Sequence, residues 1–149
     1  MKPEICQWKN YIKDVKSSYW KNKIINSINN IVSLYSINSQ EIRLQRKSVN
    51  PREILVAAQE ECDLKTAEYL SKTKYAHKLP APITLIEYKD KRVIFIGSNR
   101  SLVFMLKGKK PDCLIVILPS NIKKPEIFSF ANETLAELIK QQEKLNEER

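Results

Sequence analysis

The chain has 149 residues, which is the length of one ordinary domain and enough to bury a hydrophobic core without disulfides or metals. Its 26 Lys and Arg against 17 Asp and Glu give a formal net charge of +9, which favours acidic partners such as nucleic acid or nucleotides, or an anionic membrane. One histidine and two glycines exclude multi-histidine metal sites, the P-loop and the glycine-rich dinucleotide fingerprint.

The cysteines and the apolar runs indicate the compartment. Cys6, Cys62 and Cys113 lie far apart and form no C-x-x-C pair, so neither a zinc ribbon nor a thioredoxin-like redox pair is indicated. We expect them to be buried or free thiols in a reducing environment. The longest apolar run has only the length of a strand, and the N-terminus has no secretory pattern. We therefore expect a cytoplasmic protein that does not enter membranes.

The N-terminal third is basic and has helical periodicity. Residues 1–50 carry nine Lys or Arg and three Asp or Glu. Apolar residues spaced by three and four predict one helix over residues 5–19 and a second over 24–35, separated at Ser17-Ser18 or at Asn22. A lysine stripe flanks the apolar face of the first helix. It either contacts the phosphates of a nucleic acid or is a solvated flank, and it comprises Lys2, Lys9, Lys13, Lys16 and Lys23.

The next segment predicts a strand and then helices. Alternating apolar residues favour a short strand over 41–47. A helix start follows, in which Asn50 is the N-cap, Pro51 is the first helical residue and Glu53 reaches back to the cap. We expect this helix to continue over 54–62, and a second one, capped by Asp63, to reach about residue 76.

The segment 82–118 is the most informative. Strands are predicted over 83–88, 92–96 and 113–118, and a turn over 89–91. Gly97 interrupts the second strand and precedes a helix over 100–107, which Gly108 closes in the left-handed position. A final helix capped by Asn132 is expected, with apolar residues directed inward at Leu135, Leu138, Ile139 and Leu145.

These elements predict an α+β fold, a small mixed sheet with flanking helices. Residues 1–40 would form a helical N-terminal extension. Residues 41–149 would form the sheet domain with its C-terminal helix.

The order of the motifs resembles the ParB/sulfiredoxin superfamily over roughly residues 42–120. The matching residues are Pro82-Ile83, the strand 93–96, Gly97-Ser98-Asn99-Arg100, Leu106-Lys107-Gly108, the strand 114–118 and, upstream, Asn50-Pro51-Arg52-Glu53-Ile54. The resemblance implies a ParB-like nuclease or nucleotide-binding domain with a ParB/sulfiredoxin-like core.

The G-x-x-R loop is a candidate phosphate site on physical grounds as well. The first amides of a helix lack partners, and the helix dipole adds positive charge there. The forked guanidinium of Arg100 suits a phosphate group, and Ser98, Asn99 and Ser101 add neutral donors after Gly97. The alternative is that Ser98 or Asn99 is simply an N-cap and Arg100 a surface residue.

The chain also departs from the family. Sulfiredoxins carry their catalytic Cys directly after the loop glycine, where this chain has Ser98, so sulfinic acid reduction is not expected. Partition proteins carry Glu and a second Arg in this loop, and further domains for which the roughly thirty residues after Leu118 are too few. Free-amino-acid kinases of the family use an acidic residue near the first motif. Glu53 matches it, but Glu53 could equally serve the helix cap.

The expected function is a ParB-like, nucleic-acid-associated protein, with DNA contacted by Lys9, Lys13, Lys16 and Lys23. A phosphate or nucleotide (ATP, ADP or CTP, with Mg²⁺) would bind at residues 97–101.

Whether the protein is an enzyme stays open. A nuclease, a nucleotide hydrolase or a small-molecule phosphotransferase with Glu53 and Arg100 as catalytic residues is one alternative, and an inactive interaction protein is another. We predict no metal site built from protein ligands alone. Glu60, Glu61 and Asp63 could gather Mg²⁺ with a nucleotide, but they equally suit a helix end.

Overall fold

The computed structural model describes residues 10–56, 68, 69, 72, 81–96, 98–131 and 133–147. Within these ranges the chain forms four α-helices, two 3₁₀ turns and six strands. In chain order they are α2 (Ser18–Leu34), η1 (Ser39–Glu41), β1 (Arg43–Ser48), η2 (Pro51–Glu53), β2 (Leu55–Val56), β3 (Ile83–Tyr88), β4 (Lys91–Ile96), α4 (Ser98–Leu106), β5 (Asp112–Ile117), α5 (Ile127–Phe130), β6 (Glu133–Thr134) and α6 (Leu135–Glu147).

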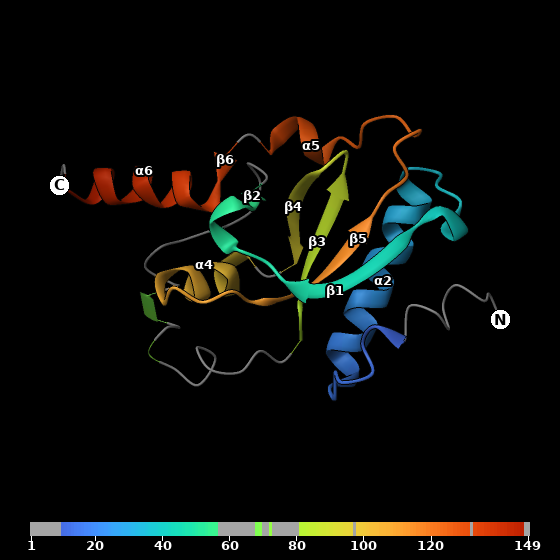
Figure 1. Cartoon of the computed structure of the whole chain (residues 1–149), viewed down its shortest axis with the longest axis horizontal. Coiled ribbons are helices and arrows are strands. Elements are labelled where there is room, and N and C mark those ends of the chain that lie inside the picture. The colour runs from blue at the N-terminus through green and yellow to red at the C-terminus, as the bar shows by residue number, and fades with distance from the viewer. Residues whose placement is uncertain are drawn as a thin grey trace.

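The six strands form one mixed sheet in the order β1-β5-β3-β4-β2-β6 (Figure 1). The β3–β4 hairpin and the β1–β5 pair are antiparallel, whereas β3 and β5 are parallel. The short strands β2 and β6 extend the sheet beyond β4, and β1 forms its opposite end. The predicted small mixed sheet with flanking helices is therefore confirmed.

Helices cover both faces of this sheet. Alternate residues of β5 enter different cores, since Leu114 and Val116 pack with α2 while Cys113 and Ile115 pack with α4 and α6. This double burial explains why β3, β4 and β5 read as nearly continuous apolar runs. Helix α2 buries Ile24, Ile28 and Ile31 in the first core, so this part of the N-terminal extension is integral to the fold.

The predicted end of α4 is confirmed in detail. Gly108 has a φ of +66°. Its N–H donates to the carbonyl of Met105 at 3.0 Å, and the N–H of Lys109 donates to that of Phe104 at 2.9 Å. These two bonds are the Schellman arrangement, which satisfies carbonyls at the end of a helix and favours glycine at the left-handed position. The predicted turn after β3 is also present, with positive φ at Lys89 and Asp90.

The first predicted helix is wrong over residues 11–17. Residues 11–14 form a turn, and α2 begins only at Ser18, so the break falls at Ser17-Ser18 rather than at Asn22. The hydroxyl of Ser17 accepts a hydrogen bond from the N–H of Trp20, which is an N-cap. The apolar spacing predicted the inward-facing Ile12 and Val15, which are buried, but not the backbone that carries them.

The helix expected from Asn50 onward is also wrong over its first residues. The cap is present, because the side chain of Asn50 accepts from the N–H of Arg52, but only the 3₁₀ turn η2 follows. Leu55 then pairs with Val93 of β4 and with Thr134 of β6. Pairing with the sheet therefore overrides the local helix signal at this point. Residues 57–67, which the prediction also covered, lie outside the described part.

The C-terminal helix α6 forms as predicted, but its cap is Thr134 instead of Asn132. The N–H of Glu137 donates to the Thr134 hydroxyl at 3.2 Å, while the Glu137 carboxylate accepts from the Thr134 hydroxyl at 3.1 Å. Threonine followed three residues later by glutamate is a capping box. Asn132 itself lies outside the described residues.

Candidate functional site

The loop with the G-x-x-R motif lies between β4 and α4. Helix α4 begins at Ser98, which places Arg100 in its first turn, and that turn contains no acidic residue. Gly97 and the side chains of Ser98, Asn99 and Arg100 lie outside the described part of the structure. Ser101 is completely buried, so its hydroxyl faces the protein interior instead of an open surface.

Glu53 lies at the opposite end of β4 from this loop. Leu55 pairs with Val93, near the start of β4, whereas α4 begins after Ile96, where β4 ends. At about 3.3 Å per residue, the first and last residues of β4 are about 16 Å apart. The turn η2, which carries Glu53, nevertheless packs against α4 and α6. The side chain of Arg100 lies outside the described residues, so the pairing of Glu53 with Arg100 in a phosphotransferase site stays a prediction.

Glu53 lines an open pocket of about 420 Å³ beside the β3–β4 turn, together with Asp90, Lys91 and Arg92. Arg92 is held in an ion pair by Glu87, its cross-strand neighbour, with 2.7 Å between Nε and Oε1. Charges of both signs line this pocket, so it has no preference for a strongly anionic ligand. Within the described part of the chain no hydrogen bond involves the Glu53 carboxylate, so the predicted capping role is not seen.

The predicted lysine contacts lie around the start of α2. Lys13, Lys16 and Lys23 are exposed, and Lys9 lies outside the described residues. The sequence from residue 15 to residue 40 contains three lysines and no Asp or Glu. The surface of α2 therefore carries positive charge that no carboxylate of its own segment offsets. We refer to Lys13, Lys16 and Lys23 as the α2 lysine surface.

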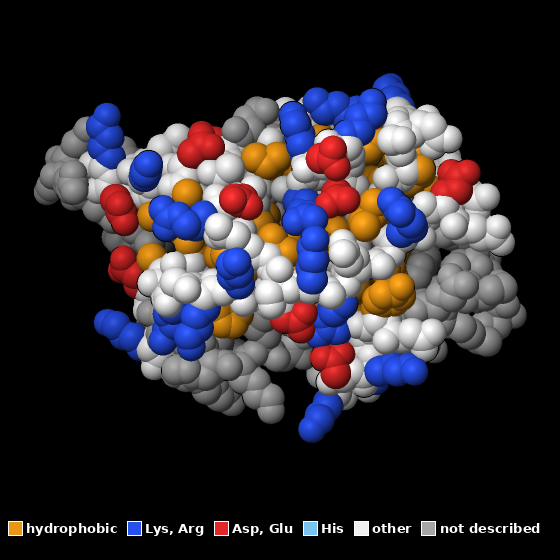
Figure 2. Space-filling view, in the orientation of Figure 1, with side chains coloured by type: hydrophobic (Ala, Val, Ile, Leu, Met, Phe, Trp, Pro, Cys, Tyr) orange, Lys and Arg blue, Asp and Glu red, His pale blue; other side chains and the backbone are white. Residues whose placement is uncertain are grey.

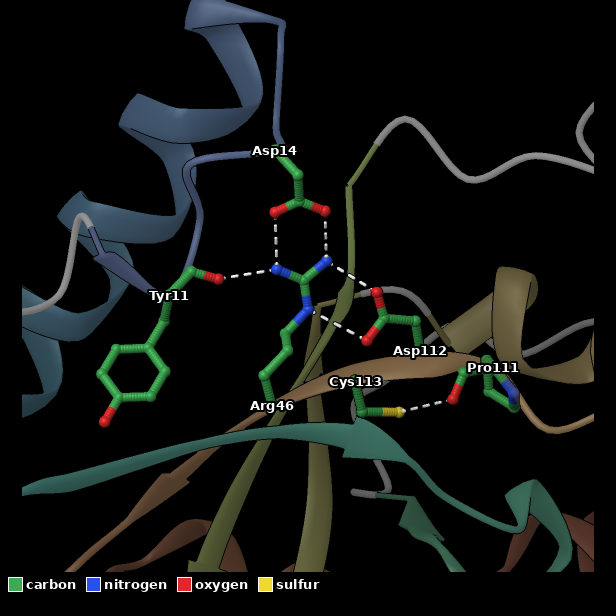
Figure 3. A network of polar contacts seen from close by, with 6 residues as sticks. All are labelled: Tyr11, Asp14, Arg46, Pro111, Asp112 and Cys113. Carbon is green, nitrogen blue, oxygen red and sulfur yellow. Dashed lines mark hydrogen bonds and ion pairs between the residues drawn. The ribbon is translucent and has the colours of Figure 1, made fainter.

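The carboxylate nearest in sequence, Asp14, is already neutralised by Arg46 of β1 (Figure 3). The guanidinium holds Asp14 with two bonds of 2.8 Å and Asp112 with bonds of 2.9 and 2.6 Å. Its fifth bond, of 2.6 Å, goes to the carbonyl of Tyr11. These contacts use all five N–H donors of the arginine. Hydrogen bonding to Arg46 lowers the pKa of Asp14, and the bond to Asp14 is the main reason why the pKa of Arg46 is raised.

Two aromatic side chains lie within the α2 lysine surface. Tyr19 is 65% exposed, and its ring meets that of Trp20 edge to face with 5.3 Å between centroids. The ammonium of Lys23 lies 5.7 Å from the Tyr19 ring and 5.1 Å from the Trp20 ring. An exposed ring beside lysines can stack on a nucleic-acid base while the lysines contact phosphates.

A pocket of about 380 Å³ lies at the start of α2. It is lined by Ile12, Lys13, Ser18, Lys21, Asn22 and Ile25. Two cations, a hydroxyl and a carboxamide thus surround a partly apolar floor, and the described lining contains no carboxylate. This lining is compatible with a phosphate group, which accepts hydrogen bonds from each of these polar side chains.

The central position of Arg46 was not predicted from the sequence. A lone arginine on an exposed strand carries no local signal, and its partners are 32 and 66 residues away. Cys113, predicted to be a buried or free thiol, is a buried free cysteine, and burial raises its pKa to about 12. Cys6, Cys62, Glu60, Glu61 and Asp63 lie outside the described residues.

The described residues contain neither a membrane-spanning helix nor a metal-binding cluster. None of the helices there combines the length and the apolar character needed to cross a membrane. No group of three or more Cys, His, Asp and Glu side chains in that part of the chain is arranged to hold a metal ion.

Comparison of the chain with family models, with curated proteins and with solved structures finds no match.

Proposed function

We propose that this protein binds nucleic acid through the α2 lysine surface, with DNA as the first candidate. One observation carries the proposal: Lys13, Lys16 and Lys23 are exposed on a segment whose nearest carboxylate, Asp14, is neutralised by Arg46. Unpaired lysines release counterions from a phosphate backbone when they bind it. The exposed ring of Tyr19 and the pocket between Lys13 and Lys21 support the same proposal.

The resemblance to ParB-like domains supports a second component, a phosphate or nucleotide held at residues 97–101 with Arg100 as its main ligand. In favour of this site, α4 begins at Ser98 directly after a central strand, and its first turn has no acidic residue to repel an anion. ATP, ADP and CTP, each with and without Mg²⁺, are the ligands to be tested. Any nuclease or hydrolase activity would depend on this component.

The test of nucleic-acid binding is the salt dependence of affinity for labelled duplex and single-stranded DNA. The logarithm of the affinity falls linearly with the logarithm of the salt concentration. Each phosphate contact contributes about 0.9 to the steepness of this fall for duplex DNA and about 0.7 for single strands. We expect Lys13→Gln/Lys16→Gln/Lys23→Gln to weaken binding and to reduce the duplex slope by about 2 to 3. The matched control, Lys109→Gln/Lys124→Gln/Lys140→Gln, removes the same charge from exposed positions elsewhere. An equal loss in the control would show that only net charge matters and would refute the proposed surface.

The nucleotide component is tested separately by thermal unfolding. A ligand that binds only the folded state raises the stability by RT ln(1 + [L]/Kd). We expect at least one of ATP, ADP and CTP to raise the melting temperature of the wild type, and Arg100→Ala to abolish the increase. A shift that persists in Arg100→Ala would exclude this arginine as the phosphate ligand.

A further inference from the structure

Strand β1 has an unpaired edge. It forms one end of the sheet, and β5 is its single strand neighbour. Across the described residues, no backbone hydrogen bond satisfies the edge of β1 that faces away from β5. In Figure 1, β1 crosses in front of α2 as the outermost long strand. The N–H and C=O groups of alternate residues along this six-residue strand thus point away from β5 and can pair with another extended chain.

The side chains of β1 divide sharply between the two faces of the sheet. Leu44 pairs with Val116 and packs in the core beneath α2, so this strand is anchored from one side. Arg43, Gln45 and Lys47 are opposite Ile117, Ile115 and Cys113, which places them on the face that carries α4 and α6. All three are exposed. Figure 2 shows Lys and Arg side chains spread across the visible side of the molecule.

The two cations on this edge are not held in ion pairs. Neither Arg43 nor Lys47 forms a salt bridge in the part of the chain that the structure describes, although Glu41, Glu87 and Asp90 line the same pocket as Arg43. Asp112, the carboxylate opposite Ser48 at the end of the strand, is engaged by Arg46. Arg46 also ties β1 to Asp14, so the strand is held in an extended form before any partner arrives. Preorganisation of this kind lowers the entropic cost of binding.

We propose that the free edge of β1 binds an extended, acidic segment of a partner protein by strand addition. Main-chain hydrogen bonds to β1 would supply affinity. Acidic side chains four residues apart would be selected, because Arg43 and Lys47 lie four residues apart on the same face of β1, with Gln45 between them. This proposal is independent of nucleic-acid binding, which concerns α2.

A second copy of this chain fits the edge poorly. In an antiparallel pairing centred on Gln45, Arg43 of each copy would lie opposite Lys47 of the other, and directly opposed like charges destabilise a sheet. Nucleic acid also fits poorly, because phosphates accept hydrogen bonds from backbone N–H groups but offer no donors to the backbone carbonyls. An acidic polypeptide supplies both the donors and the charge.

The test uses three fluorescein-labelled eight-residue peptides: alternating Glu and Val, alternating Lys and Val, and the Glu-Val peptide N-methylated at every second residue. We expect the wild type to bind the first peptide and neither of the others by fluorescence anisotropy. Arg43→Glu/Lys47→Glu should weaken Glu-Val binding at least tenfold and should now bind the Lys-Val peptide. Arg43→Gln/Lys47→Gln, which introduces no repulsion, should be intermediate. Equal affinity of all three proteins for the Glu-Val peptide would overturn the proposal.

Amide hydrogen exchange locates the bound peptide. We expect amides of β1 to become protected when the Glu-Val peptide is added, while those of α2 do not change. Binding without protection in β1 would place the peptide elsewhere and would refute the assignment. Sedimentation of the wild type without peptide should give a monomer, and a dimer lost in Arg43→Glu/Lys47→Glu would identify a second copy as the occupant instead.

Discussion

Arg46 and Asp14 are joined by two parallel hydrogen bonds of 2.8 Å, although 32 residues separate them. This forked pair connects the turn before α2 to strand β1. The same guanidinium binds Asp112, so the start of β5 is held as well. One side chain thus fixes three segments that the sheet and the core hold only in part. It also removes the negative charge nearest to the α2 lysine surface.

The first prediction concerns the geometry of this arginine. Arg46→Lys keeps the charge but loses the planar fork, so it cannot hold both carboxylates and the Tyr11 carbonyl together. We expect the free energy of unfolding in urea to fall by about 1 kcal/mol, because the network is partly exposed and each exposed pair contributes little. The control, Arg43→Lys on the same strand, should change it by less than about 0.5 kcal/mol. Equal losses would show that the fork adds nothing.

The second prediction is a pH dependence with a defined sign. Hydrogen bonding to Arg46 holds the pKa of Asp14 below its usual value of about 3.9. The unfolded chain therefore binds this proton more readily than the folded protein, so its contribution is complete above the usual pKa and declines as the pH falls. Asp14→Asn should be less stable than the wild type at pH 7, and the two should converge toward pH 2. A stability difference that stays constant with pH would contradict the ion pair.

The central part of the fold was predictable from the sequence because its signals are local. The continuous apolar runs of β3, β4 and β5 indicate burial on both faces, and Gly108 marks the end of α4. Each of these features depends on residues within one element. They therefore do not depend on knowledge of the tertiary contacts.

The parts that the sequence did not predict depend on distant partners. Leu55 and Val56 follow a helix N-cap that is formed at Asn50. They nevertheless form a strand, because β4 and β6 offer backbone partners. The carbonyl of Ile54 also accepts from the N–H of Leu135, which joins this segment to the start of α6. For the candidate site, the exposure of the lysines was predicted correctly, but the position of Glu53 beside the β3–β4 turn required the register of the sheet.

The third prediction concerns the cap of α6. Thr134 and Glu137 satisfy one another's polar groups at the start of this helix. Thr134→Ala should lower the free energy of unfolding by about 1 kcal/mol, because the N–H of Glu137 loses its acceptor. Thr134→Ser keeps the hydroxyl and should retain most of the stability. Chemical denaturation of both variants distinguishes the cap from the contribution of the threonine methyl group, and similar losses would point to the methyl group.

The fourth prediction concerns Thr84, whose hydroxyl is buried in β3 without a hydrogen-bond partner. The residue pairs with Ile96 and Leu114 where the register of the β3–β4 hairpin shifts, and the side chain of Leu114 is completely buried. Burial of an unpaired hydroxyl costs stability, and valine has nearly the same shape without that group. Thr84→Val should therefore raise the free energy of unfolding by about 1 kcal/mol.

The matched variant for this site is Thr84→Ser, which keeps the unpaired hydroxyl and removes a buried methyl group. It should lower the free energy of unfolding by about 1 kcal/mol, so the two variants should move the urea midpoint in opposite directions. A loss of stability in Thr84→Val would mean that the hydroxyl gains a partner in solution, such as a buried water molecule. The same result would indicate that a polar side chain is required at residue 84, which lies close to the end of β4 from which α4 begins.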